Sequence, residues 1–174
     1  MEGKSQDDRY LEAASAYGAA LDRLASAYEA DADKRRDLLQ EVHLALWRSL
    51  GSFEGRCSLR TWVFRVAHNA ATSYVIGQRR SRASSWLSLE EVAAVPDPAE
   101  GERATGRRQA VDRLLALIQQ LKPLDRQVIL SYLEGLDAVA TAEITGISPG
   151  NVATKIHRIK NLLAQRFHEG GGNG

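Results

Sequence analysis

The chain has 174 residues, of which 44% are hydrophobic and 26% are charged, a balance typical of a globular protein rather than a disordered one. Its 23 Lys and Arg against 22 Asp and Glu give a formal net charge of +1, and this near-neutral sum by itself argues against a nucleic-acid partner, for which a strongly basic balance is expected. The single cysteine excludes an internal disulfide and a cysteine-based zinc site. No apolar run approaches the roughly 18 residues that span a bilayer, and the polar, acidic start is not a signal peptide. We therefore expect a cytoplasmic protein without membrane insertion.

The first eighty residues predict three amphipathic helices. Apolar residues recur every three or four positions from Tyr10 to Tyr28, from Leu39 to Leu50 and from Leu59 to Tyr74, which places each set on one helix face. Gly51 follows the second run as a stop signal, and Ser58 precedes the third as an N-cap. The three faces can bury one common core.

The helical spacing stops between residues 81 and 106, where Ser, Pro and Gly accumulate. We expect a flexible linker there, with at most a short helical turn near residues 86–92. Helical spacing resumes at Val111, and Pro123 starts a further helix that ends near Gly135. No strand pattern and no internal repeat is found. The predicted fold is all-α, with two small helical domains at residues 1–80 and 107–169, a linker at 81–106 and a disordered tail at 170–174.

Residues 138–160 have the form of a helix-turn-helix. Gly146 can adopt the left-handed conformation that the turn needs, while Ser148 can cap the second helix and Pro149 can occupy its first position. The apolar residues of that helix face inward, and its polar face can donate hydrogen bonds to phosphates and base edges in a major groove. The alternative is a helical hairpin whose polar face is only solvated. The polar face carries Asn151, Thr154, Lys155 and Arg158.

The charges are unevenly distributed. Residues 55–89 hold six arginines and no acid, with aromatic residues among them, and residues 144–168 hold four Lys and Arg and no acid. Arginines neutralise phosphates, and aromatic faces can stack on unpaired bases. The alternatives are a solvated basic face and an aromatic stripe that belongs to the core. The near-zero net charge of the chain therefore conceals two basic surfaces. The linker at residues 81–106 is acidic overall and could mimic nucleic acid in a basic channel.

Three stretches, in this order and spacing, resemble an extracytoplasmic-function sigma factor, a small two-domain class of bacterial transcription initiation factors. Residues 37–47, DLLQEVHLALW, resemble the helix of the family that binds core RNA polymerase. Residues 53–69, FEGRCSLRTWVFRVAHN, resemble its segment for promoter melting and −10 recognition. Residues 121–136, with the helix-turn-helix after them, resemble its −35-binding domain.

The resemblance implies a factor that binds core polymerase and directs promoter-specific initiation, with no catalytic residue, metal or cofactor of its own. Its partners would be the β and β′ subunits of the polymerase, promoter DNA and an anti-sigma factor. Asp37, Gln40 and Glu41 would dock on the polymerase, and the loop at residues 51–58 would receive a flipped base. The −10 element would be bound by Arg56, Ser58, Arg60, Trp62, Asn69, Ser73, Arg79 and Arg80, and the −35 element by Asn151, Thr154, Lys155 and Arg158.

Arg35 and Arg36 depart from the family pattern, which usually has acidic residues just before the position of Asp37. Three other functions are alternatives. An enzyme is disfavoured because the four histidines are scattered and no acid, base and nucleophile form a pattern. A helix-turn-helix repressor that acts without polymerase would leave the match at residues 37–69 unexplained. A degenerate family member could act as an interaction protein.

Overall fold

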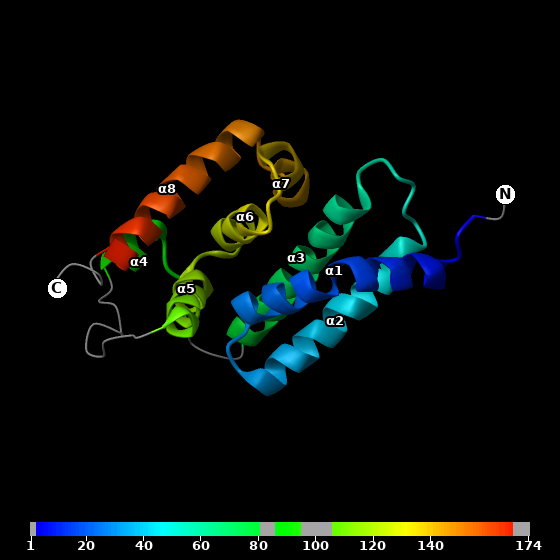
Figure 1. The fold of residues 1–174 in the computed structure, drawn as a ribbon, viewed down its shortest axis with the longest axis horizontal. Helices are drawn as coiled ribbons and strands as arrows, with labels where there is room; N and C mark the ends of the chain where they lie inside the picture. Colours follow the sequence, from blue (N-terminus) through cyan, green and yellow to red (C-terminus); the bar gives the residue numbers. More distant parts are fainter. Residues whose placement is uncertain (1–2, 81–85, 95–105, 169–174) are drawn as a thin grey trace.

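The computed structural model describes residues 3–80, 86–94 and 106–168, and these residues form an all-α fold (Figure 1). The predicted tail at residues 170–174, and most of the predicted linker, lie outside the described residues. The helices are α1 (Gln6–Tyr28), α2 (Ala32–Leu50), α3 (Leu59–Arg80), α4 (Leu89–Ala94), α5 (Arg107–Gln120), α6 (Pro123–Leu133), α7 (Ala138–Thr145) and α8 (Pro149–His168).

The N-terminal half consists of α1, α2 and α3, which pack against one another pairwise. Each helix begins at a side-chain cap of the expected kind. Ser5 and Asp8 form a capping box on α1, Asp31 accepts two backbone amides of α2, and Ser58 accepts the amide of Thr61 at the start of α3. The predicted cap at Ser58 is confirmed, and the three helices share one hydrophobic core.

Two details of this half differ from the sequence prediction. Gly51 ends α2, but its φ of −61° is right-handed, so the helix stop does not use the freedom of glycine. The face of α3 that is buried includes Phe64 and Ala67 rather than only the predicted stripe from Leu59 to Tyr74. The reason is that α3 contacts α1 and α2 on one side and α6 and α7 on another.

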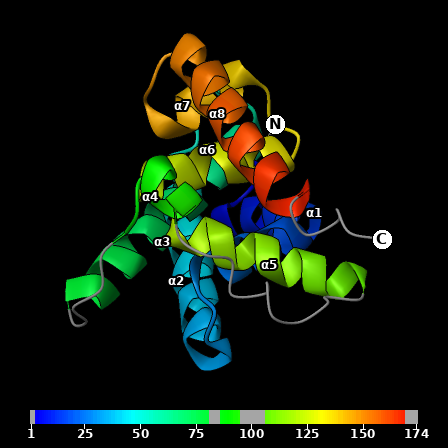
Figure 2. The ribbon, with the colours of Figure 1, turned by 90° about the vertical axis from the view of Figure 1, so that its left-hand side faces the viewer.

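The C-terminal half consists of α5 to α8 (Figure 2), and the short helix α4 lies against α8 (Figure 1). Pro123 occupies the start of α6, as predicted. Residues 125–131 of α6 are all buried, because α6 packs against α3, α7 and α8. Leu89 and Val92 anchor α4, and the amide of Leu87 donates to the carbonyl of Gln120 at 2.9 Å. The predicted helical turn in the linker is therefore real and docks on the C-terminal half.

The two halves pack against each other, which the sequence did not predict. Helix α3 contacts α7, and α1 contacts α5 (Figure 1). Across this boundary Arg23 donates two hydrogen bonds to the Glu134 carboxylate, at 2.7 and 2.9 Å. The Gln127 amide donates to the Thr72 hydroxyl at 2.8 Å. The described residues consequently share a continuous buried cluster.

Candidate nucleic-acid interface

The helix-turn-helix has the local geometry that its sequence predicts. Asp137 caps α7 by accepting the amide of Ala140, and Gly146 has the left-handed φ of 79° that turns the chain into α8. The Ser148 hydroxyl accepts the amide of Asn151, which confirms the predicted cap. The buried face of α8 includes Val152 and Ile159, so the opposite face points away from the core.

The four predicted −35-binding residues lie along this outer face but differ in their contacts. Asn151 is exposed, and Thr154 is exposed with its hydroxyl bonded to its own helix. The Lys155 ammonium donates to the Asp125 carboxylate of α6 at 2.6 Å, and the side chain is 29% exposed. The Arg158 guanidinium pairs with the Glu90 carboxylate of α4. Two of the four thus present polar groups to solvent, and two form ion pairs within the chain.

The predicted −10 loop, residues 51–58, borders a polar pocket of about 460 Å³. Trp62 lies in its wall. The indole nitrogen donates to the Ser49 hydroxyl at 3.0 Å, the Phe53 ring centroid lies 5.2 Å from that of Trp62, and the Arg65 guanidinium lies 4.8 Å above the indole. These contacts hold the ring in place without burying it. The lining is Ser52, Glu54, Arg56, Cys57, Trp62, Arg65 and, from α7, Glu143.

The remaining predicted −10 residues do not form a single cluster. Arg56 is exposed and pairs with Glu54 at 2.6 Å, while Asn69 and Ser73 are exposed farther along α3. Ser58 is used as the cap of α3, and Arg60 donates to the backbone carbonyl of Glu134. The backbone of Arg79 and Arg80 belongs to α3, but their side chains lie outside the described residues.

The predicted polymerase-binding residues Asp37, Gln40 and Glu41 are exposed together on α2. Leu44 and Trp47 continue the same face at helical spacing, with 40% and 39% of their surface exposed. The sequence analysis did not assign these two apolar residues to the surface, although their spacing from Asp37 was a usable signal. The outer face of α2 is therefore a mixed acidic and apolar stripe, a composition suited to a protein partner.

The departure at Arg35 and Arg36 does not place two free cations in this stripe. Arg36 pairs with Asp33 one turn earlier in α2. The Arg35 guanidinium lies 3.4 Å from the Ser26 hydroxyl of α1. Both side chains thus have partners outside the stripe formed by Asp37, Gln40, Glu41, Leu44 and Trp47.

Three acidic residues that the sequence analysis did not single out contact the predicted DNA-binding residues. Glu90 pairs with Arg158, Glu143 lines the pocket beside Trp62, and Glu134 anchors the boundary near Arg60. Each acid lies far in sequence from its partner. The tertiary fold brings each acid to its partner, so no local sequence signal marks them.

A buried polar pair lies where the two halves meet. The Tyr28 hydroxyl and His68 Nδ1 share a hydrogen bond of 2.9 Å. Burial lowers the pKa of His68 to about 3 and raises the pKa of Tyr28, so both are neutral at pH 7. The Arg126 guanidinium lies 5.1 Å from the Tyr28 ring, and burial lowers its pKa as well. This pair is structural, because a histidine held neutral in the core does not exchange protons near pH 7.

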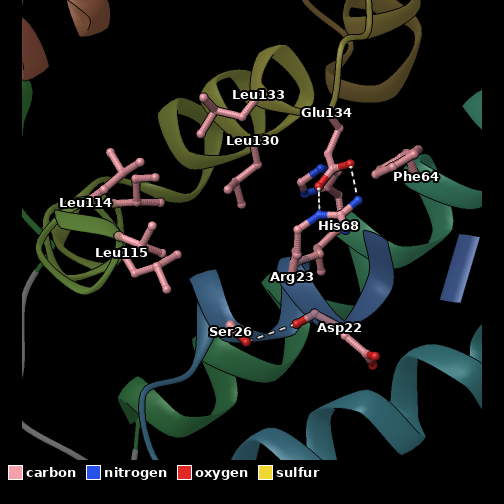
Figure 3. Close-up of a pocket in the computed structure, with 13 residues that line it drawn as sticks. Asp22, Arg23, Ser26, Phe64, His68, Leu114, Leu115, Leu130, Leu133 and Glu134 are labelled. Carbon is pink, nitrogen blue, oxygen red and sulfur yellow. Dashed lines mark hydrogen bonds and ion pairs between the residues drawn. The ribbon is translucent and has the colours of Figure 1, made fainter. Parts of the chain in front are cut away.

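A groove of about 720 Å³ opens beside this pair, between α1 and α3 on one side and α5 and α6 on the other (Figure 3). Most of its lining is aliphatic, including Leu114, Leu115, Leu130 and Leu133. Leu133 is 50% exposed at its edge. His68 lines its floor, and the Arg23–Glu134 pair lies beside it.

Within the described parts of the chain, no helix is long and apolar enough to cross a bilayer.

Known families and proteins resemble this chain in sequence. The family model for sigma-70 region 2 matches residues 14–81, and the model for sigma-70 region 4 matches residues 112–163. The RNA polymerase sigma factor CarQ of Myxococcus xanthus is 32% identical over 134 residues, which cover 76% of this chain and 74% of CarQ. The ECF RNA polymerase sigma factor SigM of Mycobacterium tuberculosis is 30% identical over 148 residues, which cover 83% of this chain and 68% of SigM.

A solved structure has the same fold. CnrH, determined in complex with the cytosolic domain of CnrY, superposes with a TM-score of 0.65 at 20% identity, covering 92% of this chain and 88% of CnrH. The identity to CarQ and SigM, over more than two thirds of each, defines the family. The chain therefore belongs to the extracytoplasmic-function RNA polymerase sigma factors, which direct transcription initiation.

Proposed function

We propose that this sigma factor uses three surfaces in initiation: the outer stripe of α2 for core polymerase, the Trp62 pocket with α3 for melted −10 DNA, and the polar face of α8 for the −35 duplex. One observation carries the proposal. The helix-turn-helix presents Asn151 and Thr154 outward, and an aromatic pocket with arginines lies in the other half of the same chain. The boundaries 1–80, 81–106 and 107–169 remain our assignment of these roles to domains.

The stripe on α2 is suited to the clamp of the β′ subunit. Asp37 and Glu41 supply negative charge, and Leu44 and Trp47 supply apolar area at the same face. The Trp47 indole donates to the Asp7 carboxylate of α1 at 2.7 Å, which limits the motion of the ring. A rigid aromatic residue surrounded by charges is a common energetic centre of a protein interface. The β subunit would meet the C-terminal half.

The Trp62 pocket is suited to one extruded base of the non-template strand. Arg56 and Arg65 supply positive charge for the phosphates, and the indole supplies a stacking face. Extrusion costs a few kcal/mol of unstacking, which such contacts offset. Binding energy alone would thus shift the promoter toward the melted state, so the factor needs no hydrolysis and no catalytic residue of its own.

The α8 face would enter the major groove of the −35 element. Asn151 and Thr154, in the first two turns, are placed to contact base edges, while Arg158 and Lys155 are suited to phosphates. This division predicts sequence specificity from the first pair and salt-dependent affinity from the second. The factor would act in the bacterial cytoplasm, where polymerase meets the chromosome.

An anti-sigma factor would use the groove between the halves. The groove has an aliphatic lining with a charged pair at its side, a combination that accepts the apolar face of an amphipathic helix. The solved relative CnrH is bound to another protein, the cytosolic domain of CnrY. That complex supports a regulatory protein partner for this chain.

Run-off transcription with purified core polymerase on a genomic library tests the proposal. We expect discrete start sites that share two upstream elements and that depend on the added factor. Tight binding to duplex DNA by the chain alone, with no start site in the presence of polymerase, would overturn it.

A further inference from the structure

The C-terminal end of α2, where the chain enters the −10 loop, is closed by side chains of α1, whose N-terminal end lies beside it (Figure 1). The last carbonyls of a helix lack partners within it, and a left-handed glycine commonly turns the chain so that they find some. Gly51 stays right-handed, with a φ of −61°. Instead, the Gln6 amide donates to the Trp47 carbonyl at 2.7 Å, and the Arg9 guanidinium donates to the Leu50 carbonyl at 3.2 Å.

The same arrangement explains why a glycine ends α2. A Cβ atom at Gly51 would lie 3.2 Å from Oε1 of Gln6, which is tighter than an ordinary van der Waals contact. Glycine is therefore needed here for the close approach of α1 and not for a left-handed backbone. The first turns of α1 are thus fitted to the end of α2.

Arg9 also reaches into the −10 loop. Its Nη1 atom, which contacts the Leu50 carbonyl, donates to the Phe53 carbonyl at 3.1 Å as well. Hydrogen bonds from a charged donor are stronger than neutral ones, so this one nitrogen ties the helix end to the loop. The centroid of the Phe53 ring lies 5.2 Å from that of Trp62. Arg9 therefore fixes the residue that packs against the stacking face of the pocket.

The remainder of the loop has little support of its own. Within the described part of the chain, the amides of residues 54–57 make no backbone hydrogen bond. Gly55 has a left-handed φ of 74°, and Arg56 is exposed beside it. The loop is held at its two ends, by Arg9 at Phe53 and by Ser58 as the cap of α3. Because a pocket selects its ligand only when its walls are held in place, the selectivity of the pocket depends on these two anchors.

From these contacts we propose that Arg9 is a positioning residue for −10 recognition: it holds the carbonyls of Leu50 and Phe53, fixes the loop against Trp62 and so sets how strictly the pocket selects the extruded base. The inference rests on the proposed role of the Trp62 pocket in binding that base. Arg9 acts through the loop and not by touching DNA. The determinants of −10 recognition thereby extend to α1, outside the motif at residues 53–69.

Direct contact with DNA is the competing role for Arg9. Together with Lys4 it lines a hollow of about 440 Å³ that borders the loop, and both side chains could meet a phosphate there. The two roles predict different measurements. Loss of a phosphate contact weakens binding almost equally for all sequences and lowers the slope of affinity against salt by about one. Loss of a positioning contact lowers base selection and leaves the salt slope unchanged.

Run-off transcription by the full chain with core polymerase measures base selection. The templates derive from a promoter that the factor transcribes and carry each possible base at the extruded position. Arg9→Met keeps the length of the side chain but removes both bonds, so the ratio between the best and the worst base should fall about fivefold or more. Arg9→Lys should keep most of the selection, because an ammonium can replace the one nitrogen that makes both bonds. Arg108→Met is the control, since it removes the same charge from an exposed position of α5, and it should match the wild type.

Hydrogen exchange tests the loop without DNA or polymerase. The amides of Ser52 and Phe53 donate to the carbonyls of Ser49 and Leu50, at the end of α2 that Arg9 closes. Loss of the arginine donors should speed exchange at these two amides. We therefore expect faster exchange there in Arg9→Met, while Arg108→Met exchanges as the wild type does.

The salt dependence of promoter binding by the holoenzyme separates the two roles. The slope should be unchanged in Arg9→Met and should fall by about one in Arg56→Met, because Arg56 is the proposed phosphate contact. A lower slope in Arg9→Met with unchanged base selection would assign Arg9 to a phosphate and overturn the proposal.

Base selection and exchange equal to those of the wild type, in an Arg9→Met protein that circular dichroism shows to be folded, would also overturn it. If Arg9→Met does not fold, Arg9→Gln gives the same test, because its shorter side chain stops at the position of the arginine Nε. A wild type that gave no initiation with core polymerase would refute the proposed function. Initiation by the wild type, with Arg9→Met indistinguishable from it, would remove only the role of Arg9.

Discussion

The Trp62 indole and the Ser49 hydroxyl share a hydrogen bond of 3.0 Å, which joins the start of α3 to the last turn of α2. The bond sets the angle of the ring that walls the polar pocket. Because Ser49 lies on the proposed polymerase-binding helix, the geometry of the −10 pocket is coupled to the element that would contact polymerase. Trp62 is thus the most informative residue for tests of promoter opening.

Replacing Trp62 with Ala should impair opening of a duplex promoter more than use of a template that is already melted. Stacking of a base on an aromatic side chain is worth about 1–3 kcal/mol, so initiation on the duplex should fall roughly fivefold or more. Run-off transcription on the matched duplex and bubble templates measures the ratio. Trp62→Phe, which keeps a stacking face but not the bond to Ser49, should lose less. An equal loss on both templates would argue against a role in melting, once thermal unfolding shows that the variant is folded.

Replacing Asn151 with Ala should weaken binding to the −35 duplex and relax its sequence preference. A lost base contact costs about 1–3 kcal/mol, concentrated at one base position. Gln165→Ala is the control, because Gln165 is exposed on the same helix about four turns away. Fluorescence anisotropy of polymerase holoenzyme on a set of single-base −35 substitutions measures both effects. A uniform loss of affinity across all sequences would mean that Asn151 contacts the DNA backbone rather than a base.

Reversing the charge of Glu41 should reduce affinity for core polymerase without changing DNA binding by the free chain. Glu41 is exposed in the α2 stripe, and no contact of its side chain contributes to the core. Competition for core polymerase against the wild-type factor measures the effect. Asp22→Lys makes the same change on α1, in the lining of the groove between the halves, and should compete as the wild type does. If Glu41→Lys competed for core polymerase as well as the wild type does, Glu41 would not belong to the polymerase interface.

Stability should fall as the pH drops below about 6.5 because of His68. Its pKa is about 3 in the folded protein and near 6.5 when unfolded. Between these values the unfolded state binds the additional proton, so the free energy of unfolding decreases with falling pH, by at most about 1.4 kcal/mol per pH unit. Urea unfolding at pH 7.5 and pH 5 should show a loss of about 2 kcal/mol that is absent in His68→Gln. Identical pH dependence in the two proteins would contradict a neutral buried histidine.

The local features of the fold follow from local sequence. Ser58 and Ser148 cap helices, Gly146 turns the chain and Pro123 starts α6, as side-chain and backbone preferences within a few residues require. The predicted outer face of α8 is likewise confirmed for Asn151 and Thr154 as exposed positions, while their contacts with DNA stay predictions.

The relationship between the halves could not be predicted in this way. Arg23 and Glu134 are 111 positions apart, and nothing in the local sequence of either residue marks it as a partner of the other. Periodicity specifies that α3 has an apolar face but not that a second partner covers Phe64 and His68. The pairing of Arg158 with Glu90 is a similar case, since the acidity of the linker was visible but its docking on α8 was not.

The division of promoter recognition between the two halves is tested most directly by crossing protein variants with promoter variants. Wild type, Asn151→Ala and Trp62→Ala would each be assayed by run-off transcription on templates substituted separately in the −35 and −10 elements. If a variant lacks the side chain that contacts a given base, substitution of that base causes no further loss of transcription. We expect Asn151→Ala to be insensitive to substitution of the −35 base pair that Asn151 contacts but fully sensitive to −10 substitutions. We expect Trp62→Ala to be insensitive to substitution of the extruded −10 base but fully sensitive to −35 substitutions. If both variants kept the full sensitivity of the wild type to both elements, the assignment of these surfaces would be wrong.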